Sequence, residues 1–182
     1  MAVKTRLISF IWGFAEATFF FIVPDVWLSR IALTNPKEAY ISIFYAIWGA
    51  LFGGVLMYYM GAYAYEGSQE FLNYIPAISD QMITNVENTD TEADLFNIMI
   101  GGMFSGVPYK VYAVWTGHLS TPLVLFILAS ICARMARFLS VTALTHIIAK
   151  ALKTKLTAAH ISRIHIGLWV LFYAFYFSVM GF

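Results

Sequence analysis

A run of 27 residues without a charged side chain, residues 39–65, is the feature that most constrains the fold. About 20 apolar residues in a helix suffice to cross the hydrocarbon core of a bilayer. Of the 182 residues in the chain, 60% are hydrophobic and only 12% are charged, whereas a soluble domain carries about 25% charged residues. The sequence therefore predicts an all-α integral membrane protein with a single membrane domain over residues 1–182.

Two other apolar segments are interrupted by residues that break helices. Residues 7–33 contain Pro24, which lacks a backbone N–H donor and clashes with the preceding helical turn. Residues 95–120 contain Gly106 and Pro108. We expect each segment to form a hairpin of short helices that enters and leaves the membrane on one side, with Pro24, Gly106 and Pro108 at the hinges.

Long uninterrupted helices are expected elsewhere in the chain. Besides residues 39–65, the segments 123–149 and 164–180 are apolar enough to predict membrane-spanning helices. Gly49 and Gly53 are four residues apart, which places two notches on one helix face and lets another helix approach closely.

Charge is distributed unevenly among the connecting segments. Residues 66–94 hold seven acidic residues and no Lys or Arg, which predicts a solvated segment. Basic residues occur before the first apolar segment, at Lys4 and Arg6, and again in a linker over residues 150–163. Because Lys and Arg favour the cytoplasmic side of a membrane, we expect the N-terminus and this linker in the cytoplasm and the acidic segment outside.

The two halves of the chain share one layout. Residues 1–65 and 95–149 each have a broken hairpin followed by a proline and a long helix, and the first hinge prolines, Pro24 and Pro108, are 84 residues apart. The charge distribution gives the two halves opposite orientations. We therefore predict two inverted repeats, followed by a linker and a C-terminal transmembrane helix in residues 150–182. Residue identity between the halves is slight, so chance spacing of the prolines is the alternative.

Six charged side chains lie inside the apolar segments, where each costs roughly 2.5–3.5 kcal/mol at the bilayer centre. They are Glu16, Asp25, Arg30, Lys110, Arg134 and Arg137. Arg134 and Arg137 are three residues apart and share one helix face. In the simplest arrangement these arginines face Glu16 and Asp25 in a wet cavity between the repeats. Alternatively, the pairs only hold the hairpins to the long helices. Arg30 is expected at the membrane interface, and the role of Lys110 is left open.

Such a cavity predicts binding of an anion rather than catalysis. Two facing hinges with arginines nearby suit an anionic head group such as phosphate, and a carboxylate beside an arginine can load and release a proton. The stretch TGH at 116–118 is similar to one element of lipid phosphatases, but the chain has no Arg-Pro pair to complete that set. We expect no catalytic residue, metal, cofactor or nucleic-acid partner.

Five stretches together resemble one family of membrane proteins. They are EATFFFIVPD (16–25), GALFG (49–53), YYMG (58–61), FSGVPYKVYAVWTG (104–117) and RMARF (134–138). They resemble the DedA family, also called the SNARE-associated or VTT domain family, and its YqaA-like branch in particular. The resemblance covers nearly the whole chain, although Gly106 stands near where the family usually has a further proline.

The resemblance implies a fold, a location and a function. The fold is a pair of re-entrant hairpins, and the location is the inner (plasma) membrane of a bacterium or the archaeal equivalent. The function is flippase or scramblase movement of lipids such as undecaprenyl phosphate or phospholipids, with proton dependence in some members. The essential acids of the family match Glu16 and Asp25, and its essential arginines match Arg134 and Arg137.

Three functional hypotheses follow. The first is a flippase or scramblase that binds lipid phosphate at Arg134 and Arg137, with Glu16 and Asp25 as titrating partners and Lys110 beside them. The second is a proton- or cation-coupled antiporter of a small solute that uses the same acids. The third is a structural membrane protein that organises partners through Gly49 and Gly53. The expected partners are membrane lipids with anionic head groups, with protons as a candidate coupling ion. Whether the chain forms a homo-oligomer is left open.

Overall fold

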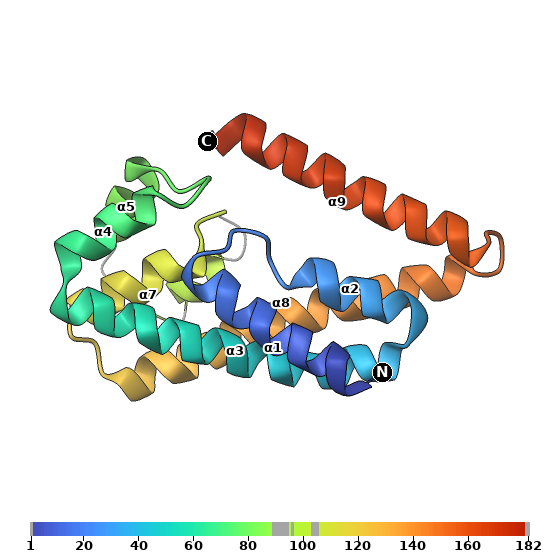
Figure 1. The fold of residues 1–182 in the computed structure, drawn as a ribbon, viewed down its shortest axis with the longest axis horizontal. Helices are drawn as coiled ribbons and strands as arrows, with labels where there is room; N and C mark the ends of the chain where they lie inside the picture. Colours follow the sequence, from blue (N-terminus) through green and yellow to red (C-terminus); the bar gives the residue numbers. More distant parts are fainter. Residues whose placement is uncertain (1, 89–94, 96, 103–105, 181–182) are drawn as a thin grey trace.

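A computed structural model describes residues 2–88, 95, 97–102 and 106–180, and every regular element assigned among them is an α-helix (Figure 1). In chain order these are α1 (Ala2–Thr18), α2 (Asp25–Thr34), α3 (Pro36–Tyr63), α4 (Tyr65–Asn73), α5 (Asp80–Glu87), α7 (Tyr109–His118), α8 (Leu123–Leu152) and α9 (Ala158–Met180). The predicted all-α fold is therefore confirmed for these residues.

Three helices in the described part of the chain are long and apolar enough to cross a membrane, and they coincide with the three predicted spans. They are Pro36–Tyr63, Leu123–Leu152 and Ala158–Val179. The linker predicted over residues 150–163 is too long, because α8 continues to Leu152 and α9 begins at Ala158. Lys150 and Arg163 lie in the two helix ends, where the apolar pattern alone does not show that the helices continue, whereas Lys153 and Lys155 lie between the helices.

The helix breaks are present at both hinges. α1 ends at Thr18 and α2 begins at Asp25, directly after Pro24. α7 likewise begins directly after Pro108. Gly106 has a φ of +78°, in the left-handed region that glycine adopts at no steric cost. In Figure 1, α1 and α2 run in opposite directions on either side of the first break.

The order of helices after each break is the same. α2 and α7 each have 10 residues, and each is followed by a long helix, α3 with 28 residues and α8 with 30. The start of α3 is fixed by Asn35, whose side chain accepts a hydrogen bond from the backbone N–H of Glu38, and by Pro36 in the first turn. α2 packs against α8, and α7 packs against α3. Each short helix therefore contacts the long helix of the other half.

Glycines bring α3 into backbone contact with two other helices. A Cβ added at Gly49 would overlap the carbonyl oxygen of Phe10 in α1, and one at Gly13 would overlap that of Ala46 in α3. One added at Gly53 would also collide with α1. α1 is thus the helix that approaches the Gly49 and Gly53 face.

A second pair of glycines, which the sequence analysis did not identify, joins α3 to α7. A Cβ at Gly61 would overlap the carbonyl oxygen of Val114, and one at Gly117 would overlap that of Tyr58. α1 and α7 therefore both meet α3 through glycines on each side of the contact, with Gly53 as a further glycine of α3 facing α1.

Replacing Gly49 by Ala should lower the free energy of unfolding by about 1–3 kcal/mol or more, because the added methyl group meets fixed backbone rather than a movable side chain. Reversible unfolding in mixed detergent micelles measures the change. Gly167→Ala in α9 is the control, since an added Cβ there meets nothing within 4 Å. Equal stability of the Gly49 variant and wild type would contradict the close approach of α1 and α3.

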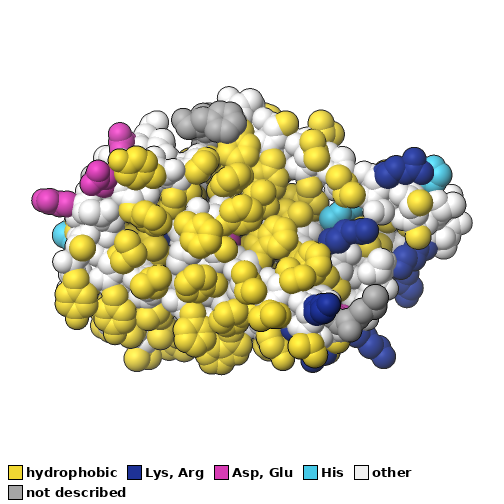
Figure 2. Space-filling model, viewed as in Figure 1, with side chains coloured by type: hydrophobic (Ala, Val, Ile, Leu, Met, Phe, Trp, Pro, Cys, Tyr) yellow, Lys and Arg dark blue, Asp and Glu magenta, His cyan; other side chains and the backbone are white. Residues whose placement is uncertain are grey.

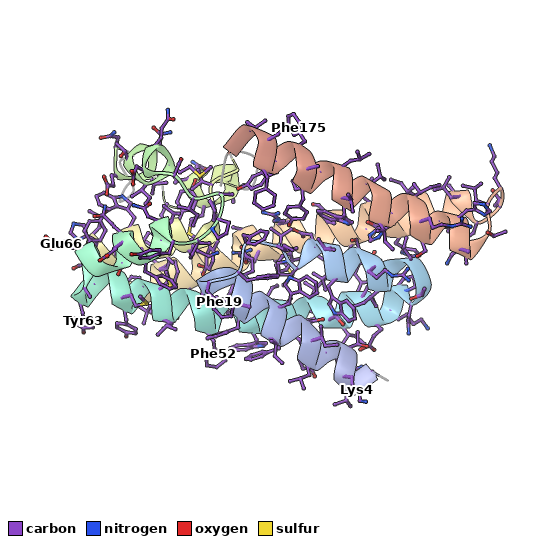
Figure 3. All side chains as sticks on the ribbon, turned by 45° about the horizontal axis from the view of Figure 1, so that its top comes forward. Lys4, Phe19, Phe52, Tyr63, Glu66 and Phe175 are labelled. Atoms are coloured by element: carbon purple, nitrogen blue, oxygen red, sulfur yellow. The ribbon has the colours of Figure 1, made fainter. Side chains whose placement is uncertain are left out.

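The surface separates into an apolar middle and two charged ends. Figure 2 shows apolar side chains over most of one face, with Lys and Arg gathered at one end and Asp and Glu at the other. Lys4 and Glu66 mark these opposite ends in Figure 3. This segregation has the pattern expected for a chain whose middle lies in a membrane.

The acidic segment is more ordered than its composition indicates. α4 and α5 form within it, and they bury Leu72, Ile83 and Val86 in the main hydrophobic core. Charged side chains occupy the other faces of these short helices, which explains why composition alone predicts a solvated segment. Three of its acidic residues, Asp90, Glu92 and Asp94, lie outside the described residues.

Candidate functional site

A cavity of about 240 Å³ lies where the two hinges meet the middle of α8 and the end of α9. Four of the five residues predicted to bind substrate or protons line it, namely Glu16, Lys110, Arg134 and Arg137. The fifth, Asp25, is buried and pairs with Arg137. Of the predicted hinge residues, Gly106 and Pro108 line the cavity and Pro24 lies beside Asp25 at the start of α2.

The first ion pair joins the end of α1 to the middle of α8. Arg134 approaches Glu16 with both terminal nitrogens, at 2.9 Å from Nη1 to Oε2 and 3.2 Å from Nη2 to Oε1. Each side chain is only 5% exposed. The guanidinium also lies over the ring of Tyr109, 4.1 Å from its centroid, which adds a cation–π attraction. Arg134 is therefore held from two sides.

The second ion pair joins the start of α2 to the same face of α8. Arg137 donates from Nε to Oδ2 of Asp25 at 2.7 Å. Asp25 is the first residue of α2, where the positive end of the helix dipole favours a carboxylate. The Asp25 side chain is 1% exposed, whereas that of Arg137 is 28% exposed. The other carboxylate oxygen, Oδ1, is buried and has no hydrogen-bond partner among the described residues.

Lys110 connects the two hinges. It is the second residue of α7 and is buried, and its Nζ donates to the backbone carbonyl of Phe20 in the first hinge at 2.7 Å. Among the described residues, this is the hydrogen bond that Nζ makes. An ammonium group carries three N–H donors. Lys110 thus has donors to offer a ligand, a role that the sequence left open.

The side chains that line the cavity carry an excess of positive charge. Three of them are basic and one, Glu16, is acidic, and Asp25 lies behind the lining in its pair with Arg137. The N-terminal end of α7, with Tyr109 and Lys110, also faces the cavity. A helix N-terminus attracts anions. Among the described residues no group of three His, Cys, Asp or Glu could hold a metal ion. The arrangement of charges can bind an anion.

α9 closes one wall of the cavity, which the sequence analysis missed. The hydroxyl of Tyr173 accepts a hydrogen bond from the backbone N–H of Val23 at 2.9 Å. The hydroxyl of Tyr176 donates to the backbone carbonyl of Gly106 at 3.2 Å. Two tyrosines three residues apart therefore bind one hinge each. Their spacing is the signal available in the sequence, but aromatic residues in a spanning helix are equally typical of a membrane interface.

Replacing Tyr173 by Phe should loosen the first hinge, because the backbone N–H of Val23 loses its partner, at a cost of about 1–3 kcal/mol. Hydrogen exchange of residues 19–24, followed by mass spectrometry, should become faster. Tyr63→Phe is the matched control, since that side chain is 85% exposed. Unchanged exchange at the hinge in the Tyr173 variant would show that this hydrogen bond does not hold it.

The sequence is similar to curated proteins from two bacteria. An uncharacterized protein from Haemophilus influenzae is 30% identical over 134 residues, which is 72% of this chain and 67% of that protein. An uncharacterized homologue from Histophilus somni is 32% identical over 130 residues, which is 71% of this chain and 66% of that protein. No family model and no solved structure matches the chain.

Proposed function

We propose that this chain, which belongs to the same family as the Haemophilus influenzae protein, binds the phosphate of a membrane lipid in its cavity and moves that lipid across the bilayer. The observation that carries the proposal is a largely buried cluster of three basic and two acidic side chains between two helix breaks and the middle of α8. Groups so costly to bury need a polar partner. The resemblance of the sequence to the DedA family favours the same class of flippase or scramblase activity.

The geometry favours particular contacts for the phosphate. Arg134 is already engaged by Glu16 with both terminal nitrogens, whereas Arg137 is partly exposed and Lys110 retains donors. An arriving phosphate therefore meets Lys110 and Arg137 first. Guanidinium and ammonium groups form strong charge-assisted hydrogen bonds with phosphate oxygens. Uptake of a proton by Glu16 or Asp25 would balance the added negative charge, so coupling to protons is part of the proposal.

The proposal includes an orientation in the membrane. The basic end faces the cytoplasm and the acidic end faces outward, in the inner membrane of a bacterium, with the cavity between them. The α1–α2 hairpin and the segment around Pro108 then act as re-entrant hairpins of two inverted repeats. The packing of α2 on α8 and of α7 on α3 supports this arrangement, because each short helix is held by the other half.

Reconstitution in liposomes with fluorescent phospholipids tests the proposal. Wild type should accelerate transbilayer movement above the rate in protein-free vesicles. The double variant Glu16→Gln with Arg134→Gln, which removes one ion pair without leaving a lone charge, should reduce movement to near that rate. Arg163→Gln, exposed and outside the cavity, should match wild type. Equal movement in wild-type and protein-free vesicles would refute the proposal.

One observation favours a second candidate, a proton- or cation-coupled antiporter of a small solute. The buried Oδ1 of Asp25 has no hydrogen-bond partner among the described residues and is placed to take up a proton. An antiporter would dissipate an imposed pH gradient in liposomes when a cation or solute is added, without moving labelled lipid. Movement of labelled lipid in the same vesicles would instead support the lipid transporter.

A further inference from the structure

A second space, of about 500 Å³, lies between the α1–α2 hairpin and α9 and is called here the apolar groove. The residues that line it on these elements include Trp12, Val26, Trp27, Ile166, Trp169 and Val170. Its lining is apolar or aromatic apart from Arg30 and His165. The groove is therefore different in character from the charged cavity.

The three tryptophans in the groove present ring carbons rather than donors. The indole N–H of Trp12 donates to the carbonyl of Ile22 at 2.9 Å, and that of Trp27 donates to the hydroxyl of Ser9 at 3.1 Å. The indole N–H of Trp169 lies 3.2 Å from the hydroxyl of Ser29. A sugar or a base in the groove would find these donors already in use, whereas a hydrocarbon chain needs none of them.

The groove and the charged cavity adjoin. Phe21 and Tyr173 line both of them, and Tyr173 is held in place by its hydrogen bond to Val23. A molecule that places a charged group beside Arg137 can therefore extend an apolar part past Phe21 and Tyr173 into the groove. From Tyr173 to Ile166 the groove follows α9 for about 10 Å, from the helical rise per residue.

The groove lies on a face that would meet lipid. Ile166 and Val170 are 52% and 61% exposed, although both are apolar. α9 is long and apolar enough to span a membrane, yet almost none of it is buried inside the molecule. A hydrocarbon chain could therefore enter sideways from the bilayer core without crossing polar surface.

We propose that the apolar groove holds a hydrocarbon chain of the same lipid whose phosphate occupies the charged cavity. This inference rests on the proposed function and deepens it, because it assigns the two parts of an amphiphilic substrate to two adjoining sites. Phe21 and Tyr173 then lie at the junction between head group and chain, and α9 is a wall of the substrate site.

Photolabelling tests the inference directly. Phosphatidylglycerol with a diazirine at the end of one acyl chain is incorporated with the wild-type protein in nanodiscs, and labelled peptides are mapped by mass spectrometry. Labelling should concentrate on residues 12–27 and 166–173 and exceed that of exposed apolar residues on α3, such as Phe44 and Phe52. Labelling spread evenly over exposed apolar surface, or crosslinks of groove residues to a second copy of the chain, would overturn the inference.

A variant that fills the groove with a larger side chain provides a second test of the proposal. Val170→Trp should reduce labelling of the groove several-fold, whereas Leu168→Trp should not, since Leu168 is similarly exposed and lines neither space. If Val170→Trp fails to fold, Ile166→Trp replaces it, and the wild-type map alone still decides. Soluble glycerol 3-phosphate should also lower groove labelling several-fold, and no effect of this competitor would overturn the link between groove and cavity.

The photolabelling result and the liposome result can fail independently of each other. Strong groove labelling without transbilayer movement in liposomes would support the groove as a lipid-chain site and refute transport. Transbilayer movement with even labelling would support transport and overturn the groove.

Discussion

Replacing Arg134 by Ala should lower the free energy of unfolding by about 3–5 kcal/mol, because the change leaves a buried carboxylate without its partner. Glu16 and Arg134 are each only 5% exposed, so each is poorly solvated when the other is removed. Loss of the contact between the guanidinium and the ring of Tyr109 adds to the cost. Reversible unfolding in mixed detergent micelles gives the difference from wild type.

A double-mutant cycle separates the lone-charge effect from lost packing. Glu16→Gln and Arg134→Gln should each destabilise the protein, but the double variant should cost less than the sum of the two single changes. The expected coupling lies at the upper end of the 0.5–3 kcal/mol range, about 2–3 kcal/mol, found for residues in contact. If the two losses of stability are strictly additive, the ion pair contributes no specific interaction energy, although its atoms lie 2.9 Å apart.

Replacing Arg137 by Ala should destabilise the protein more than replacing Asp25 by Asn, although the two residues form one ion pair. The Asp25 side chain is 1% exposed and would be left as a buried lone charge, which costs about 3–5 kcal/mol. The Arg137 side chain is 28% exposed and can turn toward the cavity when Asp25 is neutralised. Asp25→Asn should therefore cost about 1–3 kcal/mol, as for a weakened buried hydrogen bond.

The same unfolding measurement checks this asymmetry. Arg163→Ala, on the exposed start of α9, is a control for the loss of an arginine and should leave stability within about 0.5 kcal/mol of wild type. A larger loss for Asp25→Asn than for Arg137→Ala would indicate that water reaches Asp25 and that Arg137 is the buried member.

The sequence predicted which side chains carry charge inside the apolar segments but not how they pair. The cost of charge there singled out six residues, Glu16, Asp25, Arg134 and Arg137 among them, because that cost depends only on residue type and surroundings. Which acid faces which arginine depends on the positions of α1 and α2 against α8. Those positions are set by packing between segments more than a hundred residues apart, which local patterns do not encode.

The position of α9 beside the cavity could not be predicted from the sequence, for a different reason. An aromatic side chain in a spanning helix is expected both at a membrane interface and against a protein cavity, so Tyr173 and Tyr176 give the same pattern for either. The two environments can be distinguished only when it is known which face of α9 points toward the rest of the protein. Likewise, Gly49 was recognised as a notch in α3, but Gly13 in α1 gave no pattern of its own, because a close approach needs both helices to be placed.

Transbilayer movement of anionic phospholipid by the Lys110→Gln variant tests the central claim most directly. Lys110 forms no ion pair with the residues that the structure describes, and a glutamine amide can still donate to the carbonyl of Phe20. The fold should therefore keep its stability to within about 1 kcal/mol. If the cavity binds lipid phosphate, loss of this charge should slow movement about tenfold or more, equivalent to about 1.4 kcal/mol or more of binding. Movement at the wild-type rate by a stable Lys110→Gln protein would contradict the account and leave the buried charges with a structural role alone.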